Sequence, residues 1–435
     1  MSDHFTPQGA FARSSHVLRA VGALAGITLL TACAGGVGAG GDGGGTGSGE
    51  GFDYSAEQAT VDGIVEDLDP VTINYQSGAP SPNALVATPA LQFKEYIEER
   101  SNGKITVDLH WSGSIASYAE VDDALADGRL DVAYVIPTYH VSEYPIYDAL
   151  AKLTIYGPST PLAGEAVTMA MMTHMAYENE GFHAEFTDKG LRALTPMIST
   201  GTYGTWCSSP NEVASDWAGS TISVPNTSAN AIVQALGASP VSLEYGEMFE
   251  GLQRNTIQCT TATPSSASAG GIVEVAPHLA YPTSGGITRT ASANVAGANF
   301  DRLPLAYQQI IFDADTALSD GFLKSIEATT VDDVDVSRQN GGDFRPFDAE
   351  SQRIIDETQR GIVDQAVEEG HISQEDVDRA QELSEYWEGR AAEVGLTDEG
   401  DLGDFDDWYE PGAVDFKPLM ELVFEEVLQE RRPGS

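Results

Sequence analysis

Ser101 and Lys104 have the spacing of a serine nucleophile and an activating amine. They enclose Asn102-Gly103 and match S-x-x-K, a pattern of serine acyl enzymes. The companion S-D-N and K-T-G elements are missing, and Asn-Gly favours a turn at the end of a helix. The G-x-S-x-G, phosphate-binding and H-E-x-x-H patterns are missing as well. We interpret the match as chance and expect no catalytic residues and no enzymatic activity.

The histidine and acidic side chains do not have the spacing of metal ligands. The eight histidines are scattered along the chain. His110 and His140 fall at two predicted strand ends, where they can approach each other, but we interpret them as solvated rim residues. The acidic stretch 368–407 lacks the ligand spacing of an EF-hand loop. The sequence therefore predicts no metal site and no cofactor.

The elements that would position a binding site alternate between strands and helices. Hydrophobic periodicity predicts a first series of strands at 71–75, 105–110 and 130–136, with helices at 89–101 and 118–127. A second series has strands at 191–197, 220–224, 240–243 and 256–260, with helices at 229–236 and 247–253. This alternation predicts an α/β fold with parallel pairing, in two doubly wound lobes.

The last third of the chain has the pattern of helices. A helical segment is expected at 303–318, and an apolar helical face follows Asp348. Ser373, with Asp376 three residues later, has the signature of a helix N-cap. The chain ends in a predicted helix with four apolar residues aligned, Leu419, Leu422, Val423 and Val427. We expect a helical C-terminal extension.

The ends of the predicted strands are the best candidates for a binding site. In doubly wound sheets, ligands bind beyond the carboxyl ends of the strands. Two such lobes that face each other form a cleft, and hinge closure buries the ligand. The strand-end residues are Gln76, Trp111, Ile136, Tyr139, Tyr203, Ser223, Asn226 and Thr263. We predict that they contact a ligand; the alternative for each is ordinary loop or core packing.

The N-terminus has the pattern of a lipoprotein signal. Arg13 and Arg19 precede a short apolar stretch, and Leu30-Thr31-Ala32-Cys33 resembles a bacterial lipobox. We predict a signal peptide at 1–32 and lipidation of Cys33, which would anchor the protein to the extracytoplasmic face of the membrane. The Gly-rich segment that follows predicts a flexible tether at 33–52. An ordinary export signal is the alternative.

The charge of the chain excludes some partners. The 66 acidic and 22 basic side chains give a formal net charge of −44 over 435 residues. Such a chain repels nucleic acid and anionic lipid, so we expect no nucleic-acid partner. An anionic ligand would need positive charge close to its site to offset the repulsion from this negative net charge.

Several motifs together resemble the solute-binding proteins of TRAP transporters, the DctP-like family. In the first lobe, FKEYIEERSNGKITVDLHWSGSI and EVDDALADGRLDVAYV resemble that family's helix, turn and strand segments. In the second lobe the similar segments are WAGSTISVP, ALGASPV and EMFEGLQ. Each motif is weak alone, but jointly they are specific, and the likeness covers about 71–318. The resemblance implies a periplasmic-binding-protein-like architecture, two lobes joined by a hinge.

The resemblance also implies the organisation of the chain and its role. The expected parts are lobe 1 at 70–190, lobe 2 at 191–285, a return to lobe 1 with a hinge-spanning helix at 286–345, and an acidic helical region at 346–435. Cys207 and Cys259 are expected at the ends of neighbouring strands of lobe 2, where they would form a disulfide; two buried free thiols are the alternative. Such proteins deliver a small molecule to membrane permease subunits.

Departures from the family bear on the ligand. The family places an arginine before its V-P motif, and the planar guanidinium of this residue binds a carboxylate through two hydrogen bonds. Here that position is Ser223. A second family arginine corresponds to Tyr203. Five aromatic residues would make the cleft more aromatic, namely Tyr75, Trp111, Tyr139, Tyr203 and Trp206. This composition favours an apolar, neutral or cationic ligand.

We therefore predict the extracytoplasmic solute-binding component of a TRAP-type transporter. Two alternatives remain open from the sequence. A surface receptor could use the tail after Asp332 to contact a sensor or partner protein. An extracellular hydrolase would need a nucleophile with a base, which the sequence does not show.

Overall fold

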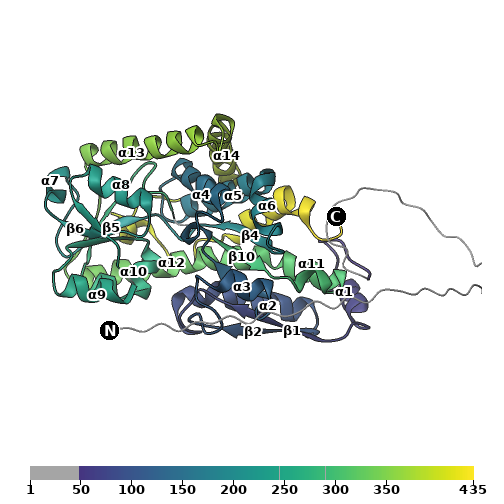
Figure 1. The fold of residues 1–435 in the computed structure, drawn as a ribbon. Coiled ribbons are helices and arrows are strands. Elements are labelled where there is room, and N and C mark those ends of the chain that lie inside the picture. Colours follow the sequence, from purple (N-terminus) through teal and green to yellow (C-terminus); the bar gives the residue numbers. More distant parts are fainter. Residues whose placement is uncertain (1–48, 244, 290) are drawn as a thin grey trace, which may run out of the picture. The chain divides into compact units, whose positions relative to one another are not determined.

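The computed structural model describes residues 49–435 except residues 244 and 290 (Figure 1). The predicted signal peptide at 1–32, the lipidation site Cys33 and nearly all of the tether at 33–52 lie outside the described residues. Within the described part of the chain, no helix combines the length and the apolar character needed to cross a membrane.

The first sheet has five strands in the order β2-β1-β3-β10-β4. They span Val71–Gln76 (β1), Ile105–His110 (β2), Val132–Val135 (β3), Arg192–Ile198 (β4) and Ser292–Ala296 (β10). β1 runs parallel to β2 and β3, with Val71 opposite Ile105 and Tyr75 opposite Val132. The carboxyl ends of these three strands therefore meet at one edge, where the loops after them are positioned.

The second sheet has six strands in the order β11-β9-β5-β8-β6-β7. They span Gly204–Cys207 (β5), Thr221–Ser223 (β6), Ser239–Val241 (β7), Cys259–Ala262 (β8), His278–Tyr281 (β9) and Phe344–Pro346 (β11). β6 pairs in parallel with β7 and β8, whereas β5 is antiparallel to β8 and β9. Each sheet has its own helices, so the α/β fold with two lobes is confirmed.

Two details of the predicted sheets are wrong. Both sheets are mixed, because β10 is antiparallel to β3 and β4, and β5 is antiparallel to its neighbours. The strand expected at 191–197 to open the second lobe is β4, which belongs to the first sheet. Its partner β10 lies about a hundred residues further along the chain. Local periodicity identifies a strand but carries no information on a partner so distant in sequence.

Helices pack on both sheets. Those before β10 span Gln58–Val65 (α1), Thr88–Arg100 (α2), Val121–Ala126 (α3), Pro145–Ala151 (α4), Ala163–Glu178 (α5), Glu180–Thr187 (α6), Ala214–Trp217 (α7), Thr227–Ala235 (α8), Tyr245–Gln253 (α9) and Pro264–Ala269 (α10). In α2 the buried residues Pro89, Phe93 and Ile97 recur every fourth position, which turns one face of the helix to the core. The helices expected at 229–236 and 247–253 correspond to α8, which ends at Ala235, and α9.

Three connections link the two sheets. The chain crosses between β4 and β5, crosses back between β9 and β10, and then follows α11 (Leu305–Asp313) and α12 (Asp315–Gln339) to β11. The 25-residue helix α12 packs against α2 beside the first sheet and against α10, which follows β8 of the second sheet. Gly321 allows the close contact with α2, because a Cβ atom there would lie 2.7 Å from Cα of Pro89.

The N-terminal part of the described chain joins the core earlier than expected. Phe52, assigned to the tether, is buried, and so are Val61 and Val65 of α1. The backbone N–H of Phe52 donates to Oε1 of Gln309 (2.8 Å), and its carbonyl accepts from Nη1 of Arg432 (2.5 Å). The helix was missed because it is short and its apolar residues cover only two turns.

The C-terminal extension is helical, as predicted, and contacts both lobes. It comprises α13 (Ala349–Glu368), α14 (Gln374–Glu393), α15 (Phe405–Trp408) and α16 (Lys417–Val423), which continues as a π-helical turn over Phe424–Leu428. Ser373 and Asp376 form the predicted capping box at the start of α14. α13 packs against α8 of the second lobe, and α14 packs against α5 beside the first sheet (Figure 1). The extension therefore bridges the two lobes.

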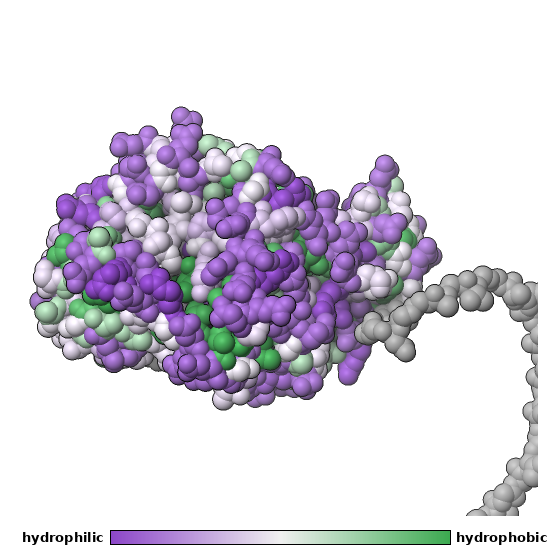
Figure 2. Space-filling view, turned by 90° about the horizontal axis from the view of Figure 1, so that it is seen from above, coloured by the Kyte–Doolittle hydropathy of each residue, from purple (hydrophilic) through white to green (hydrophobic). Residues whose placement is uncertain are grey.

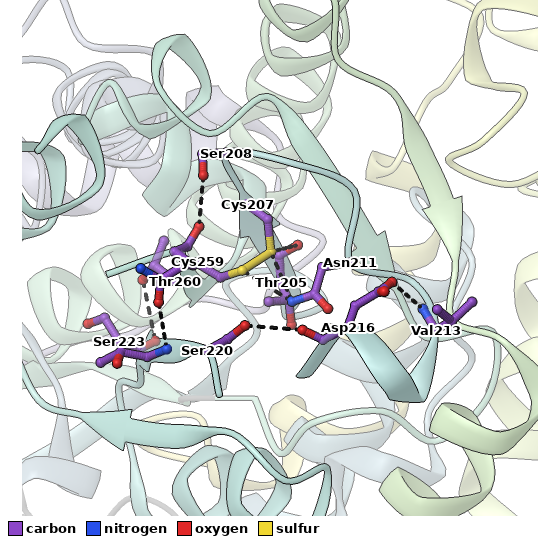
Figure 3. Close-up of a disulfide and its surroundings, with 12 residues drawn as sticks. Thr205, Cys207, Ser208, Asn211, Val213, Asp216, Ser220, Ser223, Cys259 and Thr260 are labelled. Carbon is purple, nitrogen blue, oxygen red and sulfur yellow. Dashed lines mark hydrogen bonds between the residues drawn. A yellow bond between two sulfur atoms is a disulfide. The ribbon is translucent and has the colours of Figure 1, made fainter. Parts of the chain in front are cut away.

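A disulfide joins β5 and β8 inside the second sheet (Figure 3). Cys207 and Cys259 are directly opposite each other in this antiparallel pair, with Cα atoms 4.1 Å apart. Nδ2 of Asn211 lies 3.4 Å from Sγ of Cys207 and 3.2 Å from Sγ of Cys259. The bond closes a loop that contains β6, α8, β7 and α9.

Candidate functional site

A pocket of about 650 Å³ lies where the three parallel strands of the first sheet end. Its walls come from the segments after β1, β2 and β3, from the crossing segment between β4 and β5, and from α10 and α12. Because α10 follows β8 of the second sheet, residues from both lobes face the same space. This is the place where a doubly wound sheet is expected to bind a ligand.

Gln76, at the end of β1, fixes the shape of one wall. Its buried side chain accepts hydrogen bonds at Oε1 from the backbone N–H groups of Ile115 and Ala116, both at 3.0 Å. Its Nε2 donates to the carbonyl of Ala116 at 2.9 Å. The side-chain amide therefore holds the loop after β2 against the end of β1. Gln76 lines the pocket, but its polar atoms serve mainly to position that loop.

Aromatic rings dominate another part of the wall. The rings of Tyr118 and Tyr139 are perpendicular, with centroids 6.2 Å apart, and Tyr118 lies 6.4 Å from Tyr134. Phe322 of α12 lies 6.0 Å from Tyr134 on the other side. Gly78 permits the close approach of the loop after β1, since a Cβ atom there would lie 2.7 Å from Cδ1 of Tyr134. All four rings line the pocket.

The hydroxyls of Tyr118 and Tyr134 stay protonated at neutral pH, because both pKa values are raised. Burial raises the pKa of Tyr118 to about 12, and the nearby Tyr139 adds to the shift. Burial likewise raises the pKa of Tyr134 well above its usual range, with further contributions from its tyrosine neighbours, Tyr118 first. The hydroxyls therefore present neutral donors and acceptors.

No formally charged side chain lines the pocket among the residues that the structure describes. Arg289 is a buried cation in the segment that crosses from β9 to β10, and its Nη1 lies 2.8 Å from Oε2 of Glu165. Its Nη2 donates to the carbonyl of Pro158 at 3.0 Å. On α12, Lys324 pairs with Asp320 (2.6 Å) and does not face the pocket. These cations already have anionic partners within the protein.

Four of the eight predicted strand-end residues line the pocket. They are Gln76, Ile136, Tyr139 and Tyr203. The structure does not bring Trp111, Ser223, Asn226 or Thr263 to it. Trp111 is partly buried against the core, and Trp206, expected in the same cleft, is fully buried and donates to the carbonyl of Ala262.

The other three residues are used within the second lobe. Asn226 caps α8 by accepting from the N–H of Ala229 (2.8 Å), and Thr263 caps α10 by accepting from the N–H of Ser266 (3.2 Å). A polar residue between a strand and a helix has the same sequence signature whether it caps the helix or contacts a ligand. Ser223 lies within β6 and is fully buried.

Sequence reasoning missed Tyr118, Tyr134 and Phe322, as well as Ser325 and Ile326 of α12. Tyr134 is a residue inside β3, and the α12 residues lie almost two hundred positions later in the chain. The aromatic character of residues 118, 134 and 139 was the available signal. It carries no information on which rings share a space before the topology is known.

Ser101 and Lys104, the S-x-x-K pair, have structural roles. Oγ of the buried Ser101 accepts from the N–H of Ile105 at 3.0 Å. Nζ of Lys104 donates to the carbonyls of Glu66 (2.6 Å) and Leu68 (2.9 Å). Neither residue lines the pocket. Within the described residues, no three His, Cys, Asp or Glu side chains are arranged to hold a metal ion.

Known proteins share this fold. The chain is 24% identical over 277 residues to the ectoine-binding periplasmic protein TeaA of Halomonas elongata, covering 61% of this chain and 78% of that protein. The solved structure of the ectoine-binding protein from the TeaABC TRAP transporter of Halomonas elongata superposes with a TM-score of 0.60 at 20% identity, covering 73% of this chain and 100% of that one.

A second solved structure is similar to the same degree. The sugar acid binding protein of Advenella mimigardefordensis, in complex with galactonate, has a TM-score of 0.60 at 18% identity and covers 74% of this chain and 99% of that one. At such identities the superpositions show the two-lobe fold. The model of the family "Bacterial extracellular solute-binding protein, family 7" matches residues 77–369. Because this match spans more than half of the chain, the protein belongs to that family of extracellular solute-binding proteins.

Proposed function

We propose that this protein is the solute-binding component of a TRAP-type transporter. It captures one small organic solute in the pocket at the ends of β1, β2 and β3 and delivers it to membrane permease subunits. The observation that carries the proposal is the position of the pocket, which is lined by loops of the first lobe and by α10 of the second. Family membership and the similarity to TeaA support the same role.

The lobes provide a way to close over the solute. We assign the first lobe to the sheet that contains β1 and the second lobe to the sheet that contains β8, linked by the two crossing segments and α12. Movement about these segments would bring Ser265 and Ser266 of α10 towards the loops after β1 and β2. Gln76, Ile136, Tyr139 and Tyr203 are the ligand-contacting residues that we retain from the sequence prediction.

The solute is released unchanged. The pocket contains serine, threonine and tyrosine hydroxyls but no histidine, lysine or carboxylate among the described residues, so a nucleophile there has no base. The contacts of Ser101 and Lys104 support the same conclusion.

Cys33 carries the lipid that holds the protein on the extracytoplasmic face of the membrane. The lipobox ending at Cys33 and the Gly-rich segment after it support this assignment. Cys33→Ala is expected to release the protein into the soluble extracytoplasmic fraction. Retention of that variant in the membrane fraction would contradict the anchor without affecting the assignment of the pocket.

A thermal-shift screen of the full-length protein against carboxylates, aromatic compounds, ammonium compounds and neutral solutes tests the function. A ligand of the native state at a hundred times its Kd adds about 2.7 kcal/mol of stability, which raises Tm measurably. Ala269→Trp places an indole in the pocket and is expected to abolish the shift. Ala392→Trp, on an exposed helical alanine of α14, is the matched control. Equal shifts in both variants would refute the pocket as the site.

A further inference from the structure

The aromatic rings that line the pocket have uncovered surface available to a ligand. Tyr139 is 55% exposed and Tyr118 is 41% exposed. Together with Tyr134 and Phe322 they form a group, the ring cluster, in which neighbouring centroids are 6.0–6.4 Å apart. The perpendicular rings of Tyr118 and Tyr139 make an edge-to-face contact, so the edge of one ring packs on a face of the other.

Among the residues that the structure describes, no cationic side chain lines the pocket. A carboxylate in a largely desolvated site requires a charged fork or several convergent N–H groups. Arg289, a buried guanidinium in the segment that crosses from β9 to β10, is paired with Glu165 and also donates to the carbonyl of Pro158. Lys324 pairs with Asp320 on the same helix. Moving either cation to a ligand would leave a buried or partly buried carboxylate unpaired.

The polar groups of the pocket also fit a sugar poorly. Sugar hydroxyls are best held by planar side chains that donate and accept in pairs, such as amides and carboxylates. Gln76 is the one planar polar side chain among the described lining residues, and its amide holds the loop after β2. The remaining polar atoms are hydroxyls and backbone groups.

An organic cation fits this pocket better than a carboxylate or a sugar does. The face of an aromatic ring carries partial negative charge, so several rings around one space attract a methylated or delocalised ammonium group. Such a group is weakly hydrated and loses little on entering an uncharged pocket. The formal net charge of −44 adds a field that attracts cations to the protein and repels anions.

Resting on the proposed solute-binding function, we propose that the pocket selects a small organic cation bearing a methylated or delocalised ammonium group, which contacts the rings of Tyr118, Tyr134, Tyr139 and Phe322 on the pocket wall. The positive group lies against the part of the wall that the ring cluster forms, and the rest of the solute extends towards Ser265 and Ser266 of α10. This ligand class differs from the organic acids that an arginine side chain in the pocket would bind.

Three probes of similar shape test whether the charge of the ligand determines its affinity for the pocket. Choline, its neutral isostere 3,3-dimethylbutan-1-ol and the anion 3,3-dimethylbutanoate are titrated into the full-length protein by calorimetry. We expect choline to bind at least roughly tenfold more tightly than the neutral alcohol, since a ring cluster gains little from an uncharged tert-butyl group. We expect the anion to bind more weakly than both. Equal affinities for choline and the alcohol, or tightest binding of the anion, would overturn the proposal.

Substitutions of the aromatic residues test whether choline binds at the ring cluster. Tyr118→Leu and Phe322→Leu are expected to weaken choline binding by roughly fivefold to thirtyfold each and to change alcohol binding by less than about twofold. Tyr118→Phe retains the ring and is expected to keep choline affinity within about threefold. Circular dichroism spectra and Tm values of the variants verify that each is folded. If the leucine variants weaken both probes equally, the rings act by packing alone and the proposal fails.

The outcomes separate this inference from the proposed function. If a carboxylate or a sugar from the broad screen binds and Ala269→Trp abolishes that binding, the solute-binding function stands and the cation proposal is wrong. If no solute of any class binds and choline also gives no heat, both proposals fail.

Discussion

Arg289 and Glu165 form a buried ion pair, with Nη1 and Oε2 2.8 Å apart and each side chain 2% exposed. Arg289 lies in the segment that crosses from β9 to β10, and Glu165 lies on α5. Glu165 also accepts hydrogen bonds from Ser199 (3.0 Å) and Thr202 (2.5 Å), in the segment that crosses from β4 to β5. One carboxylate therefore joins both crossing segments to the first lobe.

Glu165→Gln is expected to destabilise the protein by about 3–5 kcal/mol, because it leaves the Arg289 guanidinium buried without its counter-charge. Urea denaturation measures the loss. Glu357→Gln removes the carboxylate of an exposed pair with Arg353 and is expected to cost less than about 1 kcal/mol. Equal costs for the two variants would show that burial of the pair has no energetic consequence.

Arg432 near the C-terminus contacts the N-terminal part of the described chain. Its Nε and Nη2 bind the two oxygens of the buried Asp313 at 2.7 and 2.8 Å, and its guanidinium lies 4.8 Å from the ring centroid of Phe52. Arg432→Met is expected to cost about 3–5 kcal/mol in urea denaturation, because burial already opposes ionisation of Asp313 and raises its pKa.

The neighbouring residue Arg431 supplies the control for that variant. It pairs with Glu180, whose side chain is 83% exposed, so Arg431→Met is expected to cost less than about 1 kcal/mol. If both substitutions have the same small effect, the C-terminal residues are not part of the stable core.

Much of the local structure could be predicted from the sequence, because it depends on neighbouring residues. β2 has the predicted bounds, and the capping box at Ser373 forms as expected. The membership of β4 in the first sheet could not be predicted, because β10 pairs with it from a distant part of the chain.

The candidate site, too, could be predicted only in part from the sequence. The strand-end rule selects Trp111, the residue directly after β2, whereas the pocket uses Tyr118 at the far end of that loop. The loop reaches the pocket because Gln76 binds its backbone, a contact between residues about forty positions apart. Phe322 contributes through α12, whose packing is decided by tertiary structure.

The disulfide is expected to stabilise the second lobe. Cys207 and Cys259 are 52 residues apart, and closing a loop of this length restricts the unfolded chain by about 2–4 kcal/mol. The Cys207→Ala/Cys259→Ala double variant is expected to lose that amount in urea denaturation, and reductant is expected to have no further effect on it. Two thiols that react with a labelling reagent in unfolded, unreduced Cys33→Ala protein would show that the bond does not form.

Asp333 makes stability depend on pH. It is 1% exposed, and neither carboxylate oxygen has a hydrogen-bond partner among the described residues. Burial, with a smaller contribution from Asp332, raises its pKa to about 9. Between about pH 4 and 9 the folded state therefore holds a proton that the unfolded state has lost, so the contribution of Asp333 to stability falls as the pH rises.

Asp333→Asn is expected to be increasingly more stable than the unsubstituted protein as the pH rises from 5 to 8, with a slope of up to about 1.4 kcal/mol per pH unit. Denaturation series at several pH values measure the difference. Asp335→Asn, on an exposed residue of the same helix, is the control and is expected to show no such trend. A constant difference between Asp333→Asn and the unsubstituted protein would show that Asp333 ionises normally in the folded state.

We propose above all that the pocket at the ends of β1, β2 and β3 holds one small solute and returns it unchanged. Equilibrium dialysis of the full-length protein against the solute identified by the screen, followed by denaturation and mass spectrometry, tests it directly. We expect one equivalent of solute per chain, recovered with its mass unaltered, and none retained by Ala269→Trp. Conversion of the solute, or equal retention by Ala269→Trp, would contradict it.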